Sequence, residues 1–384
     1  MDAALALEPR QAPAPAIDGR KRRAWLATVT IAWVLIFAAM VAMKLTSIAT
    51  TEFHDPDDEL RLVEVRDLLA GQDWFDLHQY RVDAAGGGVP MHWSRIVDVP
   101  IAAVILLLRP LVGQPAAEWA ALLVVPGITL LAMLGLVGWM ASRTLAPRAR
   151  LLSICVLAVA APVIIQVMPL RIDNHGWQIV LALGAVAAFL DPSERRGGAL
   201  SGTALACWMA ISFEGLPLSA WFIAVHALWA LFDPAMRTRL VATMQSLAVT
   251  SAALFLATRG LANLAPQCDA IAPIHLAMFA WGAVAISVPA MWKPQSRMAL
   301  AGGLGAAGLG ALALVAIAAP QCTTGSFDML DPVVRSFWYD NVQEGKPLWR
   351  ADWHIIAQYL VPPLVGLWSA LSLARRTTGL PRRW

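Results

Sequence analysis

Charged residues are scarce in this sequence. Asp, Glu, Lys and Arg together make up 14% of its 384 residues, whereas soluble domains carry roughly 25%. Apolar residues supply 58%, and the mean hydropathy is +0.61. A soluble protein with so few charges would lack the polar surface that keeps it dissolved. A bilayer is therefore the expected solvent for most of the chain.

Other classes of protein are excluded by what the composition lacks. It matches neither a disordered chain nor a collagen, and four cysteines in a chain of this length do not make a disulfide-rich secreted scaffold. No basic patch with interleaved aromatic residues is present, so we expect no nucleic-acid partner. The expected partners include membrane lipids.

Long apolar runs are abundant, and they predict transmembrane helices. The run after the basic cluster 20–23 is too long for a signal peptide and lacks a convincing cleavage site, so we expect a retained helix. The runs interpreted as crossings are 24–45, 117–141, 150–168, 175–190, 198–213, 217–232, 239–258, 274–292, 298–319 and 353–374. They predict an all-α integral membrane protein with about ten transmembrane helices, although several runs are shorter than the ~20 residues of a full crossing.

Basic residues between these runs predict the orientation, because cytoplasmic loops are enriched in Lys and Arg. If the apolar segment 97–112 lies on the outer surface without crossing, both termini and most basic residues are cytoplasmic. The residues in the inner loops are then Arg143, Arg148, Arg150, Arg195, Arg196, Arg237, Arg239, Lys293 and Arg297. The expected organisation is a disordered cytoplasmic tail (1–23), a polytopic membrane domain (24–374) with long outer loops at 48–116 and 320–352 that carry surface helices, and a second cytoplasmic tail (375–384).

The first outer loop opens with four carboxylates in five residues, Asp55-Pro56-Asp57-Asp58-Glu59. Like charges this close raise one another's pKa unless a cation offsets them. A hard divalent metal or a general base would use such a cluster. The structural alternative is a helix start, where Asp at the N-cap and Glu in the first turn are ordinary.

Two further acidic segments fall on the same outer face. Arg171, Asp173 and His175 lie between two apolar runs, where ionisable groups are costly and usually functional. The alternative is that Arg171 and Asp173 pair with each other and cap a helix. The last outer loop contains Glu344 and Lys346 in a stretch that is unremarkable alone. Three distant acidic segments on one face are what an oxygen-rich metal site needs.

Together these motifs resemble those of the oligosaccharyltransferase catalytic subunits, within the C-type membrane glycosyltransferases. The matching segments are Asp55-Pro56-Asp57 after the first span, Asp173-Asn174-His175 after the third, Val342-Gln343-Glu344 with Pro347 in the late outer loop, Trp74-Phe75-Asp76, and the surface segment 97–112. The resemblance covers roughly residues 24–374. It does not extend to the family's soluble C-terminal domain, whose Trp-Trp-Asp-Tyr-Gly motif is only echoed, in the wrong place, by Trp338-Tyr339-Asp340.

The resemblance implies transfer of a sugar or oligosaccharide from a polyprenyl-phosphate-type donor to a protein, glycan or lipid acceptor. It places this reaction at the outer face of the cytoplasmic membrane, with Mg²⁺ or Mn²⁺ stabilising the departing phosphate. The expected catalytic residues and metal ligands are Asp57, Asp173 and Glu344, with Asp55, Asp58 and His175 as alternate ligands. The cations expected to hold the donor phosphates are Arg81, Arg95, Arg171 and Lys346.

The sequence leaves three alternatives open. Glu214 either joins the acidic site or ends a helix in a tight turn with Gly215 and Pro217. Cys268 and Cys322, each in a Pro-Gln-Cys context in an outer loop, form a disulfide if that compartment is oxidising. The alternative function is a transporter or flippase for lipid-linked sugars or small solutes. The clustering of acidic groups at one face and the lack of an internal repeat favour the enzyme.

Overall fold

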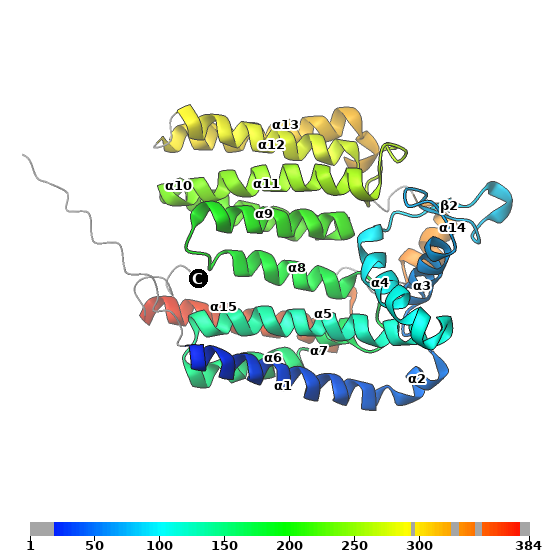
Figure 1. Ribbon diagram of the computed structural model, residues 1–384. Coiled ribbons are helices and arrows are strands. Elements are labelled where there is room, and N and C mark those ends of the chain that lie inside the picture. Colours follow the sequence, from blue (N-terminus) through cyan, green and yellow to red (C-terminus); the bar gives the residue numbers. More distant parts are fainter. Residues whose placement is uncertain (1–18, 293–295, 324–329, 342–347, 377–384) are drawn as a thin grey trace, which may run out of the picture.

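The computed structural model describes residues 19–292, 296–323, 330–341 and 348–376. In these ranges the chain is almost entirely helical, which confirms the predicted all-α class. The described strands are β1 (His78–Gln79) and β2 (Val89–Pro90), which pair as a short antiparallel hairpin. The long helices lie side by side, with the hairpin and several short helices at one end (Figure 1).

Seven helices in the described ranges are long and apolar enough to cross a membrane. They are α1 (Gly19–Met43), α5 (Gln114–Thr144), α10 (Leu216–Phe232), α11 (Pro234–Thr258), α12 (Pro273–Trp292), α13 (Arg297–Ala318) and α15 (Trp353–Arg376). This finding supports a multi-pass membrane protein.

The other three predicted crossings are also helical. One is a pair bent by 67°, in which α6 (Pro147–Val159) is followed by α7 (Ala161–Ile164) and the 3-10 turn η2 (Ile165–Val167). The other two are α8 (His175–Ala188) and α9 (Glu194–Ile211), which lie between α5 and α11 (Figure 1). Because α8 has only 14 residues, fewer than the ~20 of a full crossing, the count of ten stays a prediction.

The first and last helices extend into the segments predicted as tails. Helix α1 begins at Gly19, so the last residues of the expected disordered segment 1–23 are helical. Helix α15 continues to Arg376, two residues into the expected tail 375–384. Residues 1–18 and 377–384 lie outside the described ranges.

Short polar side chains fix the starts of several helices. Each of five N-cap side chains accepts a hydrogen bond from a backbone N–H of the first turn, which otherwise has no partner inside the helix. These residues are Asp55, Ser94, Ser193, Asp233 and Ser296. The structural interpretation of Asp55 as an N-cap is thus confirmed.

One end of the array carries α2 (Leu45–Thr50), α3 (Pro56–Leu69), α4 (Arg95–Val112) and the hairpin (Figure 1). Helix α4 contains the apolar segment predicted as a surface helix. It is not among the helices apolar enough to cross. Ile101 and Ile105 of α4 pack against Ala117 and Ala121 at the start of α5, so α4 is fixed to the array by a continuous apolar contact.

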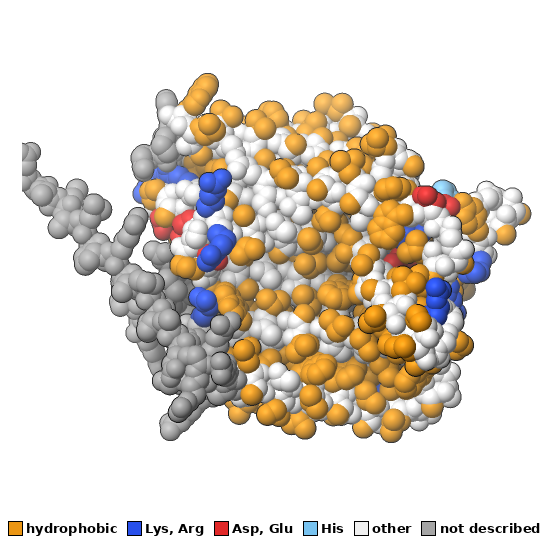
Figure 2. Space-filling model, viewed as in Figure 1, with side chains coloured by type: hydrophobic (Ala, Val, Ile, Leu, Met, Phe, Trp, Pro, Cys, Tyr) orange, Lys and Arg blue, Asp and Glu red, His pale blue; other side chains and the backbone are white. Residues whose placement is uncertain are grey.

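The middle of the array has an apolar exterior. Figure 2 shows hydrophobic side chains over the middle of the visible face, with Lys, Arg, Asp and Glu gathered near its two ends. Large side chains such as Leu35, Leu228, Val284 and Leu312 are more than half exposed. Such a surface is unsuited to water and fits contact with lipid tails.

Small residues let α9 and α11 approach closely. A Cβ atom at Gly202 would overlap the carbonyl oxygen of Thr243, and one at Gly198 would overlap that of Arg239. The fully buried Ser201 lies between the two glycines in sequence. The spacing Gly198-x-x-x-Gly202 is typical of tight helix pairs in membranes.

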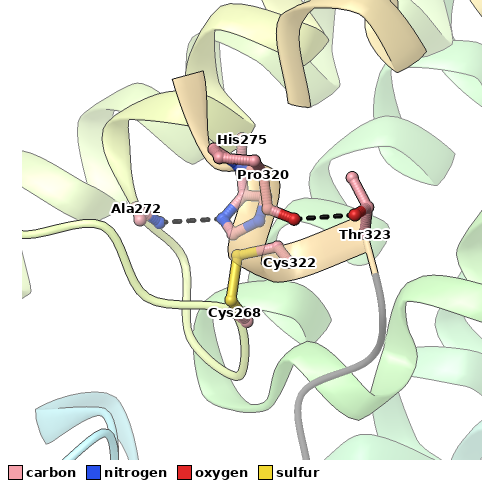
Figure 3. The surroundings of a disulfide bond; sticks show 6 residues. All are labelled: Cys268, Ala272, His275, Pro320, Cys322 and Thr323. Atoms are coloured by element: carbon pink, nitrogen blue, oxygen red, sulfur yellow. Dashed lines mark hydrogen bonds between the residues drawn. A yellow bond between two sulfur atoms is a disulfide. The ribbon is translucent and has the colours of Figure 1, made fainter. Parts of the chain in front are cut away.

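The predicted Cys268–Cys322 disulfide is present in the structure (Figure 3). It ties the loop after α11 to the 3-10 turn η4 (Pro320–Thr323) after α13. Beside it, the His275 ring accepts a hydrogen bond of 3.1 Å from the backbone N–H of Ala272. The bond joins positions 54 residues apart and removes freedom from the unfolded chain.

We expect Cys322→Ser to lower the free energy of unfolding by about 2–4 kcal/mol, the usual contribution of a native disulfide. Thermal unfolding of the purified protein in detergent, with and without reductant, measures this loss. The control is Cys155→Ser, which removes an exposed free cysteine. Equal losses in the two variants, or a wild type insensitive to reductant, would contradict the prediction.

Candidate functional site

The first two acidic segments meet at the end of the array that carries α3. The start of α3 contacts the loop 168–174, which precedes α8, and the 3-10 turn η3 (Phe213–Gly215) adjoins the first turn of α8. The start of α3 and the loop 168–174 are more than 100 residues apart in sequence, with a separation of 115 between Asp58 and Asp173. The convergence expected for these two motifs is therefore seen.

Asp58 is the joint between the two segments. Its side chain is fully buried. One carboxylate oxygen accepts the backbone N–H groups of Ile172 (2.8 Å) and Asp173 (3.0 Å), and the other accepts from the Arg171 guanidinium at 3.0 Å. With both oxygens occupied, Asp58 holds the loop in place, and this geometry does not support its assignment as an alternate metal ligand.

Arg171 is the buried cation of the cluster. Its Nη1 lies 3.1 Å from Asp55 and 3.0 Å from Asp58, and its Nη2 donates to Gln166 at 2.8 Å. Its contact with Asp173 is longer, at 3.8 Å. The expected pair between Arg171 and Asp173 is therefore present, but Arg171 lies closer to the carboxylates of the first acidic segment.

The electrostatic balance at this joint is set by burial. Burial raises the pKa of Asp58 to about 7, against the opposing effect of Arg171 and with a further upward effect of Asp173. At Asp55, which is more exposed, the hydrogen bond from Asp57 and the contacts with Arg171 outweigh burial and lower the pKa.

A hydrogen-bonded chain links the second motif to Glu214. His175 Nε2 lies 3.3 Å from the Asp173 carboxylate. The amide nitrogen of Gln178 lies 2.8 Å from Asn174, 3.3 Å from His175 Nδ1 and 3.2 Å from Glu214. The contact with Gln178 connects Glu214 to the site. Glu214 also lies in the tight turn Phe213–Gly215, so both expectations for this residue hold.

Two further residues of the site, Gln178 and Trp208, were not predicted from the sequence. The indole N–H of Trp208 donates to the Gln178 side-chain oxygen at 2.9 Å. The signal for Gln178 was present, because Asn174 and Gln178 are four residues apart and share one face of α8. Nothing local pointed to Trp208, which lies 30 residues further along the chain.

A second buried ion network lies behind the site, between α3 and α4. Arg61 is fully buried and donates to Asp98 (3.0 Å) and Glu64 (3.3 Å), with its guanidinium 4.5 Å from the centre of the Trp93 ring. Burial raises the pKa of Glu64 to about 7, against the attraction of Arg61 and with the repulsion of Asp98. Arg61 therefore contacts both buried carboxylates, and Arg95 also pairs with Asp98, at 3.2 Å.

This network predicts a stability that falls as pH rises. An ordinary glutamate has a pKa of 4.5 and Glu64 one of about 7, so between these values the folded state binds more protons than the unfolded state and loses stability with increasing pH. We expect Glu64→Gln to flatten this dependence, measured as the melting temperature from pH 4.5 to 8. Glu59→Gln, on the exposed side of the same helix, serves as the control. An unchanged pH profile in Glu64→Gln would rule this effect out.

The expected phosphate-binding cations are occupied by carboxylates. Arg81 lies 2.7 Å from Asp67, and Arg95 lies 3.2 Å from Asp98 while donating to the carbonyl of Asp76. Arg171 is held as described above. These contacts do not support phosphate binding by the three arginines, which stays a prediction, and Lys346 lies outside the described residues.

The metal site is likewise not seen in the described ranges. They contain no group of three or more His, Cys, Asp or Glu side chains placed to hold an ion. Asp55 and Asp58 are taken up by the joint, and one oxygen of Asp173 accepts the N–H of Asn174. Asp57 lies half-buried in the first turn of α3. The third motif, with Glu344, falls in 342–347 and so outside the described residues. A site for Mg²⁺ or Mn²⁺ stays a prediction.

Comparisons with known proteins leave the site to be interpreted from its geometry. No protein-family model, no curated protein and no solved structure matches the chain.

Proposed function

We propose that this protein is a membrane glycosyltransferase that moves a sugar or oligosaccharide from a polyprenyl-phosphate-type donor to an acceptor outside the cytoplasmic membrane. The observation that supports it most is the contact between the first two acidic segments at one end of the helical array. Asp58 and Asp173 are 115 residues apart in sequence, and the Asp58 carboxylate lies 3.0 Å from the backbone nitrogen of Asp173.

The disulfide supports an outer location for this end. Disulfides persist in oxidising compartments outside the cytoplasm. The loop that contains Cys268 also carries Arg259 and Asn263, which donate to the carbonyls of His92 and Phe75 in the first outer loop. Basic residues such as Arg143, Arg196 and Arg297 lie at the helix ends far from the disulfide and the first outer loop. Those ends are expected on the cytoplasmic side.

The chemistry assigned to the site is acid–base catalysis. In the proposed reaction Asp57 orients or deprotonates the acceptor nucleophile. Asp173 orients the His175 ring, since a carboxylate beside one ring nitrogen fixes the tautomer. Addition of Mg²⁺, Mn²⁺ or a chelator measures whether the reaction depends on a metal ion.

The proposal is tested by mass spectrometry of envelope glycans, glycolipids and glycoproteins from a deletion strain. We expect a sugar modification to disappear on deletion and to return with the wild-type protein. Asp57→Asn should lower its rate of formation about 100-fold or more, the usual effect of losing a general base. Glu59→Gln, a neighbouring exposed carboxylate, is the matched control. Full restoration by Asp57→Asn at wild-type protein levels would contradict the assignment.

The second candidate is a transporter or flippase for lipid-linked sugars or small solutes. One observation favours it, namely the 67° bend between α6 and α7, because transporters bind substrate at broken helices. In that case the deletion strain would accumulate the lipid-linked sugar on the cytoplasmic side, and Asp57→Asn would leave sugar transfer intact.

A further inference from the structure

A pocket of about 240 Å³ lies beside the joint, outside the catalytic residues proposed above. It is far larger than the ~10–15 Å³ that one water molecule requires. The residues that line it are Lys44, Ser47, Glu52, Phe53, His54, Ile165, Met168, Pro169, Leu170 and Arg171. One wall therefore comes from the junction of α1, α2 and α3, and the other comes from η2 and the loop after it.

The pocket is placed at the level of lipid headgroups. Both of its walls begin where an apolar candidate span stops, α1 at Met43 and the bent pair at Val167. Polar groups directly beyond the ends of such spans lie in the interfacial region, where lipid phosphates are found. Apolar side chains such as Ile165 and Met168 line the pocket together with the charged ones.

Two opposite charges share this pocket without pairing to each other. Among the described residues, Lys44 and Glu52 form no ion pair within 4.0 Å and no side-chain hydrogen bond, although both line the same cavity. Arg171 also lines the pocket, but Asp55 and Asp58 neutralise its charge. A cavity with separate, uncompensated positive and negative groups is complementary to a zwitterion.

Backbone strain marks both walls of the pocket. Thr51 (φ 54°) and Leu170 (φ 75°) adopt the left-handed region, which residues other than glycine rarely occupy. Leu170 is 2% exposed and donates to the carbonyl of Leu122 at 2.9 Å, so the surrounding structure maintains this conformation. Such strain clusters at ligand-binding segments.

We propose that this pocket binds the phosphoethanolamine headgroup of a membrane phospholipid. Lys44 receives the phosphate as a charge-assisted donor, and Glu52 accepts hydrogen bonds from the ammonium. His54 lies at the exposed rim. The inference concerns binding alone and does not depend on sugar transfer.

The test is a lipid titration of the purified full chain by native mass spectrometry. The probes are phosphatidylethanolamine, phosphatidylcholine and phosphatidylglycerol with identical acyl chains. We expect phosphatidylethanolamine to bind about tenfold more tightly than phosphatidylcholine, whose quaternary ammonium has no N–H to donate. Glu52→Gln should remove this preference, and Lys44→Gln should weaken phosphatidylethanolamine binding about tenfold.

Two controls distinguish binding in the pocket from an effect of surface charge in general and from misfolding of the variants. Arg109→Gln removes an exposed cation at the end of α4, outside the pocket, and should leave binding unchanged. Lys44→Arg retains the charge and should retain binding, while unchanged melting temperatures show that the variants are folded.

Several results would overturn the inference. They are equal binding of phosphatidylethanolamine and phosphatidylcholine, stronger binding of phosphatidylglycerol, or an equal loss in Arg109→Gln and Lys44→Gln. Displacement of the lipid by soluble phosphoethanolamine at similar concentrations would show that the ligand is the free compound, and would overturn the assignment to a lipid.

Discussion

Replacing Asp58 with alanine is expected to destabilise the protein by about 3–5 kcal/mol, the usual cost of removing one partner from a buried ion pair. The carboxylate is fully buried and accepts from Arg171 and from the backbone N–H groups of Ile172 and Asp173. Its loss leaves the N–H groups of Ile172 and Asp173 buried without this acceptor and removes one of the two carboxylates close to Arg171, so the loop that carries the second motif is released from α3. Thermal unfolding in detergent measures the effect.

The matched control is the adjacent residue. Asp57→Ala removes the same side chain from the same helical turn, but Asp57 is half-buried, and its loss at a helix N-terminus should cost less than about 1 kcal/mol. The two variants therefore separate stability from activity, since Asp57→Ala should remain folded and lose the proposed sugar transfer. If both variants melt at the wild-type temperature, the joint does not hold the two segments together.

Replacing Gly202 with leucine is expected to separate α9 from α11 and to destabilise the protein by about 3 kcal/mol or more, at the upper end of overpacking costs. The new Cβ would overlap the carbonyl oxygen of Thr243. Because this atom belongs to the backbone of a helix, it does not move aside as a flexible side chain would. We expect a strongly lowered melting temperature or loss of folded protein on size-exclusion chromatography.

Gly305→Leu in α13 provides the comparison. A Cβ at Gly305 meets no atom within 4 Å, and leucine has a higher helix propensity than glycine. This variant should melt at or slightly above the wild-type temperature. Equal behaviour of the two leucine variants would mean that the close approach of α9 and α11 does not contribute to stability.

Local chemistry made most of the fold predictable from sequence. Apolar runs of sufficient length can satisfy their backbone groups in a bilayer only as helices, so hydropathy alone located the segments that became α1, α5, α10 to α13 and α15. The matching contexts of Cys268 and Cys322 likewise predicted the bond that the structure contains. Both predictions rest on properties of short segments.

Sequence could not decide which acidic residues are structural. Asp57 and Asp58 are neighbours of the same type, and a helix turns each residue by about 100° from the last. Asp58 is buried because the loop 168–174, more than 100 residues away in sequence, packs against it, whereas Asp57 stays accessible.

The sequence by itself determined that the chain is an α-helical membrane protein with its acidic motifs between apolar segments, because hydropathy and charge act over one helix length. Only the tertiary structure decided which charges are neutralised. Arg61, Glu64 and Asp98 form a buried network that a charged stretch of sequence does not reveal. Coulomb interactions within a few ångströms depend on packing between elements, and that information is absent from the order of residues along any one of them.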